Sequence, residues 1–473
     1  MKRTNLYYLA LFLSFPLPVL RAQSSIYSGA YTVETKEWSR DSLRRIQYSD
    51  WKSKTTHSID QLVNFKIGNP DNLCSYGGYL PTQFSATGFF KTELLNGVWT
   101  IVDPHGHAFW ATAVNSIRLG KSPRNEEAFQ QKFKTSDSWI HSTVALLQQT
   151  GFNMAGSWST IEDIANYNKT ATAPFSYTTQ LGLLAGYIRE AVKLDSTRKP
   201  HPAISFILDP AFVSYCKRKT ESLIATAKDP ALFGHFSDNE IAFLPAEVDA
   251  ILKISDPSNL TRQALVNFCD KNSIPVGQLT KANKEVFIGL LGAVYFEVVS
   301  AAIKQADPNH LFLGSRLHSS AKNNSHLIKA ADSFVDIHSL NYYGYWEPQS
   351  NHLSDWAQWA KKPFFITEFY TKAEDSGLPN VSGAGWLVRT QKDRGLHYQN
   401  FCLQLLQSPS CVGWHWFRYQ DNDPSDPTAD PSNNDSNKGI VNTTYDAYPV
   451  LTDWMRQLNI RKYSLRNFLA KPF

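Results

Sequence analysis

The sequence predicts an α/β fold, a (β/α)8 barrel with a small N-terminal extension. Short apolar segments alternate with helical segments from about residue 109 onward, which is typical of parallel strands joined by helices. Most of these apolar segments end in a polar or aromatic residue, and barrel enzymes carry their active sites at such strand ends. Two of the predicted strand ends carry a glutamate, Glu240 and Glu368.

The barrel strands are expected in a regular order after a hairpin. The hairpin has a strand over residues 97–102, a turn over 103–106 and a second strand from His107. A helix is expected over 138–150, and a long helical insertion over about 245–305 follows the fourth strand. The eight barrel strands are expected at residues 109–115, 152–157, 203–208, 232–236, 311–314, 335–340, 364–367 and 411–414.

Three segments are expected along the 473-residue chain. Residues 1–22 have the features of a signal peptide, with a positive start, an apolar run to Leu20 and the small residue Ala22. Residues 23–95 are expected to form an N-terminal extension that packs on the barrel, including a helix around Trp38. Residues 96–473 are expected to form the catalytic barrel, which is a length that barrels with insertions reach.

The N-terminal pattern predicts export to the periplasm, the outer surface or the extracellular medium. The apolar run is short and interrupted by Pro16 and Pro18, so no stable membrane span is expected in the mature protein. The alternative is a signal that stays uncleaved and anchors the protein.

The composition excludes some function classes. The net charge is +5, only 19% of residues are charged, and no long run of one sign occurs, so a nucleic-acid partner is not expected. Aromatic residues make up 13% of the chain, and their flat faces can bind sugars or fill a large core. The five cysteines have no zinc-like spacing and can form at most two disulfides. No metal and no other cofactor is expected.

Residues 421–437 form an acidic loop that is rich in Pro and Asn and follows the eighth strand. Its aspartates could bind calcium, although their spacing does not match an EF-hand, and the composition also fits an ordinary surface loop. A loop at this position is expected on the active-site face of the barrel.

The paired glutamates predict hydrolysis of a glycosidic bond, because this reaction uses two carboxyl groups. Glu240 is the expected proton donor, and Glu368 is the expected nucleophile. A nucleophilic carboxylate must stay ionised and needs hydrogen-bond donors, for which Arg316 and either Tyr342 or Tyr343 are candidates.

The substrate is expected to lie among aromatic walls and a few fixed polar groups at the strand ends. Asp238 has two possible roles, since it could contact substrate or only hold its loop. The expected substrate-binding residues are Asn115, Trp158, Asp238, Asn239, Arg316, Asn341, Tyr342 and Trp416.

Several segments in order along the chain resemble β-agarases of glycoside hydrolase family 50. The run from Asn96 to Phe109 looks like the entry to their barrel, and residues 151–153, 156–159, 234–240, 366–369 and 413–417 continue the similarity. The resemblance spans roughly residues 95–455. It implies a retaining barrel enzyme whose acid/base follows the fourth strand and whose nucleophile follows the seventh, which places these roles on Glu240 and Glu368. It also implies cleavage of β-1,4 bonds in agarose.

The insertion after the fourth strand and the long loop after the eighth favour a partly closed, exo-acting site. The partner is expected to be a polysaccharide or oligosaccharide. Two alternatives remain: a related barrel glycosidase on another galactan or a β-glucan, and a non-catalytic carbohydrate-binding barrel. A metal-dependent hydrolase is disfavoured, because the predicted strand ends lack a convincing set of His and Asp ligands.

Overall fold

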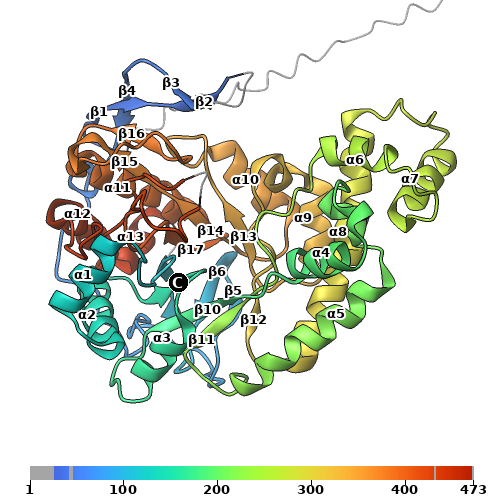
Figure 1. Cartoon of the computed structure of the whole chain (residues 1–473). Helices are drawn as coiled ribbons and strands as arrows, with labels where there is room; N and C mark the ends of the chain where they lie inside the picture. The colour runs from blue at the N-terminus through green and yellow to red at the C-terminus, as the bar shows by residue number, and fades with distance from the viewer. Residues whose placement is uncertain (1–25, 42–45, 431–432, 471–473) are drawn as a thin grey trace, which may run out of the picture.

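The computed structural model describes residues 26–41, 46–430 and 433–470, so the predicted signal peptide at 1–22 lies outside the described residues. The centre of the molecule is an eight-stranded parallel sheet with the order β12-β11-β10-β9-β8-β17-β14-β13 (Figure 1). Its strands are β8 (Ala111–Val114), β9 (Met154–Ala155), β10 (Ser176–Gln180), β11 (Leu232–Phe236), β12 (Leu311–Phe312), β13 (His338–Asn341), β14 (Phe364–Phe369) and β17 (Cys411–Trp416).

The sheet closes on itself between its two edge strands. Leu317, just after β12, forms a parallel bridge with Leu340 of β13. The Leu317 N–H donates to the Ser339 carbonyl, and the Asn341 N–H donates to the Leu317 carbonyl. The predicted (β/α)8 barrel is therefore confirmed.

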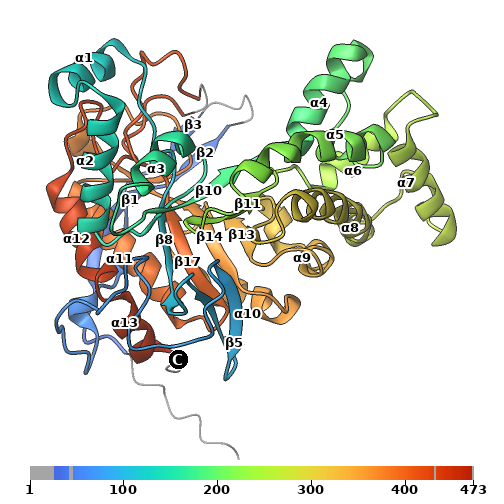
Figure 2. The same ribbon diagram turned by 90° about the horizontal axis from the view of Figure 1, so that it is seen from below.

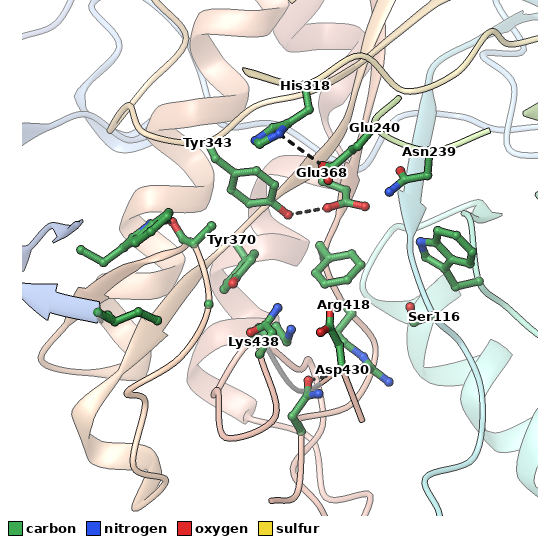
Figure 3. A pocket seen from close by; sticks show the side chains of 18 of the residues that line it. Ser116, Asn239, Glu240, His318, Tyr343, Glu368, Tyr370, Arg418, Asp430 and Lys438 are labelled. Atoms are coloured by element: carbon green, nitrogen blue, oxygen red, sulfur yellow. Dashed lines mark hydrogen bonds and ion pairs between the residues drawn. The ribbon is translucent and has the colours of Figure 1, made fainter. Parts of the chain in front are cut away.

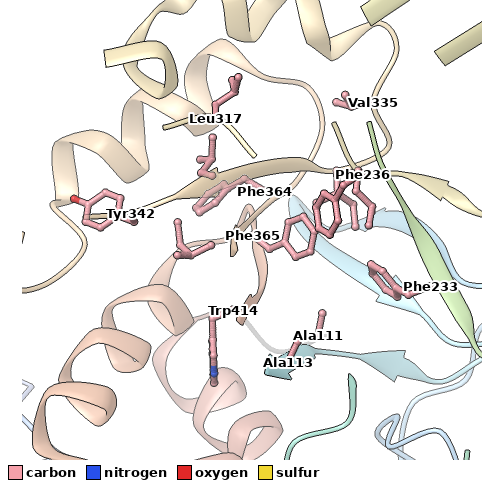
Figure 4. Close-up of a cluster of buried hydrophobic side chains, with 14 of the residues drawn as sticks. Ala111, Ala113, Phe233, Phe236, Leu317, Val335, Tyr342, Phe364, Phe365 and Trp414 are labelled. Carbon is pink, nitrogen blue, oxygen red and sulfur yellow. The ribbon is translucent and has the colours of Figure 1, made fainter. Parts of the chain in front are cut away.

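Aromatic side chains fill the inside of the barrel. The rings of Phe236 and Phe365 stack with centroids 6.0 Å apart (Figure 4). The His415 ring lies edge-on to Phe365, with centroids 4.9 Å apart. Small residues let the strands approach, since a Cβ on Gly234 would lie 2.4 Å from the Leu311 carbonyl oxygen. This close packing gives the strand ends a rigid base.

Helices lie outside the sheet, and those between β11 and β12 extend to one side of the molecule (Figure 2). The predicted insertion consists of α6 (Pro245–Leu252), α7 (Leu260–Lys271) and α8 (Lys281–Ala306). The other helices are α1 (Pro123–Lys132), α2 (Ser136–Gln149), α3 (Ile161–Asn168), α4 (Leu183–Leu194), α5 (Pro210–Thr220), α9 (Ser325–Asp332), α10 (Ser350–Trp359), α11 (Gln391–Gln407), α12 (Pro449–Asn459) and α13 (Lys462–Leu469).

Helix α8 is long and apolar enough to cross a membrane by length and composition alone. However, 56% of its most apolar window is buried, and the helix packs against α5 and α9. This burial is typical of a core helix. The five cysteines are free thiols, and four of them are buried.

The N-terminal segment joins a later part of the chain. Strands β1 (Tyr31–Lys36) and β4 (Lys52–Thr56) form one sheet with β15 (Thr371–Ala373) and β16 (Trp386–Val388). The helix predicted around Trp38 is wrong, because β2 (Trp38–Arg40) and β3 (Ile46–Tyr48) form a hairpin instead. Long-range contacts stabilise this hairpin: the Trp38 indole donates to the Ala384 carbonyl, and the Tyr48 hydroxyl donates to the Asn380 carbonyl.

The hairpin predicted before the barrel is confirmed as β6 (Val98–Val102) and β7 (Ala108–Phe109), with β5 (Lys91–Leu95) on its outer side. The strand predicted at 203–208 is wrong. Residues Ala203–Phe206 form a 3-10 helix, and β10 is the third barrel strand. The apolar run fits either structure; its Ile204 and Phe206 are buried, and the Phe206 ring packs against Tyr187 of α4.

Candidate active site

A cavity of about 390 Å³ opens at the carboxyl ends of the barrel strands (Figure 3). This volume lies within the range of about 300–1,000 Å³ that is usual for ligand sites. Residues that follow the barrel strands form most of its lining, and Trp38 and Ile46 of the N-terminal hairpin complete it. The strand-end and loop residues that line it include Ser116, Arg118, Trp158, Asn239, Glu240, His318, Tyr343, Glu368, Tyr370, Phe417, Arg418, Asp430 and Lys438.

Glu368 is the penultimate residue of β14, and its side chain is only 8% exposed. Arg316 donates from Nη2 to Oε1 over 2.7 Å, and the Tyr343 hydroxyl donates to Oε2 over 2.6 Å. Burial raises the pKa of Glu368 and the nearby Glu240 adds to this, whereas Arg316 and the Tyr343 hydroxyl lower it. Both oxygens are thus fixed in place by donors that favour the ionised form.

Glu240 lies four residues after β11 and is more open, with 31% of its side chain exposed. Asn341 donates from Nδ2 to its Oε1 over 2.7 Å, and the His318 Nδ1 lies 3.9 Å from the same oxygen. Figure 3 shows the Glu240 and Glu368 side chains next to each other at the cavity. The structure therefore brings together the two carboxylates that the sequence predicts.

Arg316 and Asn341 hold these strand ends together from below the cavity surface. Arg316 also donates to Asn239 Oδ1 over 2.9 Å and to the Thr367 carbonyl over 3.0 Å. Asn341 Oδ1 accepts from the Thr367 hydroxyl over 2.7 Å. Both side chains are fully buried, so they position the carboxylates and Asn239 rather than line the cavity.

Four residues at these strand ends adopt a left-handed backbone conformation without being glycine. Their φ angles are 55° for Ser116, 67° for Trp158, 52° for Glu240 and 52° for Arg316. Such conformations are uncommon and are concentrated at functional sites, where the surrounding structure holds them. They follow β8, β9, β11 and β12, and this position supports a functional role for this face.

Trp158 and Asn239 line the cavity as expected for substrate contacts, but other expected residues do not. The Tyr342 hydroxyl bonds to the Gln349 N–H and to His352, and the Trp416 indole donates to the Lys438 carbonyl. Both rings are buried away from the cavity. Side chains alternate in direction along an extended chain, so the following residues, Tyr343 and Phe417, take these places.

Asp238 and Asn115 also lie below the surface. Asp238 accepts hydrogen bonds from the backbone N–H groups of Leu184 and Ala185 and from the Tyr295 hydroxyl, so it holds the start of α4. Burial raises the pKa of Asp238 to about 6. Asn115 donates to the Thr367 carbonyl over 2.7 Å. Of the two roles open for Asp238, the structure favours holding its loop.

Several lining residues are not among those expected from the sequence. Phe417 and Arg418 directly follow the eighth strand, so the strand-end rule could have found them. Lys438 lies just beyond the acidic loop, and only the loop itself was singled out. Trp38 and Ile46 carry no local signal, because folding alone brings the N-terminal hairpin to the cavity.

The described aspartates of the acidic loop are bound to the chain itself. Asp421 accepts from the Asn437 amide and the Tyr448 hydroxyl, and Asp435 accepts from the Val381 and Ser382 N–H groups. These bonds fix the loop against the barrel.

A buried group of His235, Asp307 and His310 has the composition of a metal site. Each imidazole already uses both nitrogens: His235 contacts Asp307 and Thr179, and His310 contacts Asp307 and the Asp229 carbonyl. A metal ion would have to displace these bonds. The arrangement fits a hydrogen-bonded structural cluster.

The chain is similar over almost its full described length to one solved structure. The crystal structure of BpGH50 shares 30% sequence identity with it at a TM-score of 0.82, covering 93% of this chain and 96% of that chain. The agarase AgWH50C, at 22% identity and a TM-score of 0.69, and an exo-β-agarase, at 20% and 0.67, share the fold. The alignment with AgWH50C covers 84% of this chain and 67% of that structure. The alignment with the exo-β-agarase covers 83% of this chain and 68% of that structure.

Curated relatives agree with this similarity. β-Agarase B from Vibrio sp. (strain JT0107) is 24% identical over 563 aligned residues, which cover 95% of this chain and 56% of the relative. β-Agarase A from the same strain is 25% identical and is covered to 49%. The chain thus spans about half the length of these relatives. No protein-family model matches the sequence. The match to BpGH50 over nearly the whole of both chains shows that this chain belongs to glycoside hydrolase family 50.

Proposed function

We propose that the protein hydrolyses β-1,4 bonds of agarose-type galactan with retention of configuration. The carrying observation is the pair of unlike carboxylates at the ends of β11 and β14. Glu368 is buried and held by Arg316 and Tyr343, as a nucleophile requires, and Glu240 is open to the cavity, as a proton donor requires. The substrate class is supported by the names of the Vibrio relatives, which are β-agarases.

The reaction proceeds in two steps. A Glu368 oxygen attacks the anomeric carbon while Glu240 gives its proton to the glycosidic oxygen, so the C–O bond to the leaving sugar breaks and a glycosyl ester forms. Glu240 then takes a proton from water, whose oxygen attacks the same carbon and releases Glu368. Arg316 and Tyr343 stabilise the carboxylate that is regenerated.

We further propose exo action. Trp38 and Ile46 of the N-terminal hairpin, together with Gly383 and Ala384, bound one side of the cavity. A boundary of this kind favours binding of a chain end over passage of a long chain. Product sizing on agarose of defined length tests this: one short product from the outset supports exo action, whereas an initial mixture of lengths contradicts it.

Export remains a proposal that rests on the pattern of residues 1–22. N-terminal sequencing of the protein after expression in its native cell tests it directly. A mature start near residue 23 in an exported fraction supports the proposal, and an intact Met1 in the cytoplasm contradicts it.

The stereochemical proposal is tested by NMR of the first product formed from an agarose oligosaccharide. A retaining enzyme releases the β-anomer first, and the α-anomer grows only by later mutarotation. Initial α-anomer would indicate inversion. Binding of the oligosaccharide without any hydrolysis, measured by calorimetry, would instead favour a non-catalytic carbohydrate-binding barrel.

A further inference from the structure

The cavity has a second wall of a different character, formed by loops that follow β8 and β17. Arg118, Arg418 and Lys438 line this wall, and Figure 3 shows Arg418 and Lys438 on the side of the cavity away from Glu240. The two glutamates belong to the other wall. Arg118, Arg418 and Lys438 therefore have no role in the two-step cleavage by Glu240 and Glu368.

Lys438 is a buried basic residue inside this wall, with only 1% of the residue exposed. Its Nζ lies 4.9 Å from the centre of the Phe417 ring and 5.4 Å from that of Tyr370. Within the described residues, no hydrogen bond or ion pair joins this Nζ to an acceptor. Burial lowers the pKa of Lys438 well below its usual range, and the charge of Arg418 adds to this effect.

Arg418 is similarly short of partners. Its Nη1 makes one long bond of 3.3 Å to Asn422, and its Nε is buried without a hydrogen-bond partner. Burial lowers its pKa to about 10, and the neighbouring Arg118 adds to this effect. The wall thus holds adjacent like charges, which repel one another.

Several carboxylates lie near this wall and offset its positive charge. Asp430 lines the wall and favours the charged form of Lys438. Asp426 favours the charged form of Arg418 and accepts hydrogen bonds from the Lys121 and Thr428 N–H groups. The Glu368 oxygens are bonded to Arg316 and Tyr343, and Asp421 is bonded to Asn437 and Tyr448. Among the described residues, the buried Arg418 Nε has no hydrogen-bond acceptor. An anionic group bound between Arg418 and Lys438 would supply that acceptor, and its charge would favour the protonated form of Lys438.

We propose that Arg418 and Lys438, with Arg118 at the rim, form a subsite for an anionic group, a sulfate ester or a carboxylate, carried by a sugar of the galactan chain. A guanidinium can donate two parallel hydrogen bonds to such a group, and an ammonium adds a compact charge. The aromatic rings of Phe417 and Tyr370 beside Lys438 offer apolar faces for the same sugar. The inference rests on the proposed function, because it names the substrate class of the same site.

The test compares kcat/KM for three oligosaccharides of equal length: neutral agarose, the same backbone with a sulfate ester, and a galactan with a uronate. We expect a preference of about tenfold or more for one charged substrate over the neutral one, which falls as salt is raised. The charged substrate that is preferred identifies the source of the anionic group. Equal or faster cleavage of the neutral substrate overturns the inference and leaves the proposed function standing.

Variants locate the effect. Lys438→Met and Arg418→Gln should each lower the ratio of charged to neutral kcat/KM towards one. Lys329→Gln, which removes the same charge from an exposed position on α9, should leave the ratio unchanged. An unchanged ratio in both cavity variants overturns the assignment of the subsite. Cleavage of none of the three substrates overturns the proposed function and the inference together.

Discussion

The two walls of the cavity differ in how their charged side chains are paired. On the strand-end wall, formed by Asn239, Glu240 and Glu368, every residue is hydrogen-bonded to Arg316 or Asn341 beneath it. On the loop wall, formed by Arg118, Arg418 and Lys438, the cations repel one another. The first wall is organised before substrate arrives, which suits catalysis, whereas the basic groups of the second gain hydrogen-bond acceptors when an anionic ligand binds.

The largest expected effect is at the buried carboxylate. Glu368→Ala should lower kcat by about 10⁴-fold or more, because no group replaces the nucleophile. It should also destabilise the fold by about 3–5 kcal/mol, since Arg316 is left buried without its partner. Kinetics and urea unfolding measure the two effects. Glu368→Gln is the control: it is equally inactive but keeps an acceptor for Arg316, so it should be more stable than the alanine variant.

Glu240→Ala should lower kcat on the natural substrate by about 10²–10⁴-fold with little change in stability, because this side chain is partly exposed. Activity should return on an aryl galactoside whose leaving group needs no proton, and added azide should give a glycosyl azide. Full activity on agarose oligosaccharides would remove Glu240 from the acid/base role.

Substitution of two tryptophans at this face, Trp416 and Trp158, distinguishes a structural role from a ligand-binding role. Trp416→Ala should destabilise the protein by about 3–5 kcal/mol, because its ring is fully buried. Trp158→Ala should leave the free energy of unfolding nearly unchanged and weaken substrate binding by about 1 kcal/mol, because its ring is 42% exposed at the cavity. Unfolding curves and calorimetry with the inactive Glu368→Gln background measure both. The reverse pattern would place the sugar against Trp416.

The smallest expected effect is a shift of the acidic limb of the pH profile of kcat/KM. Activity requires ionised Glu368 and falls as the pH drops through its pKa, which burial raises. Arg316 lowers this pKa, so Arg316→Gln should move the acidic limb to higher pH. The exposed Arg124→Gln on α1 is a matched control that should not move it. A limb that stays in place, or moves to lower pH, would show that Arg316 does not tune Glu368.

The sequence by itself determined the barrel and most of the chemistry at its strand ends. The alternating pattern correctly predicts apolar segments such as 232–236 and 364–369 as buried strands, and a glutamate close after or within each then lies on one face of the barrel. Asn239, Glu240, Arg316 and Glu368 follow from this rule without knowledge of any contact.

Tertiary structure decided what local pattern leaves open. Strand β10 (Ser176–Gln180) consists mostly of polar residues, so its sequence lacks the apolar pattern that predicts a buried strand. Its hydroxyls can be buried because they form hydrogen bonds inside the fold, as Thr179 does with His235. A strand end also does not fix which of two consecutive residues faces the cavity, and the structure selects Tyr343 and Phe417 over Tyr342 and Trp416. Trp38 reaches the cavity only because its hairpin binds a loop 346 residues away in the chain. Such contacts depend on packing between distant segments, and local sequence does not encode that packing.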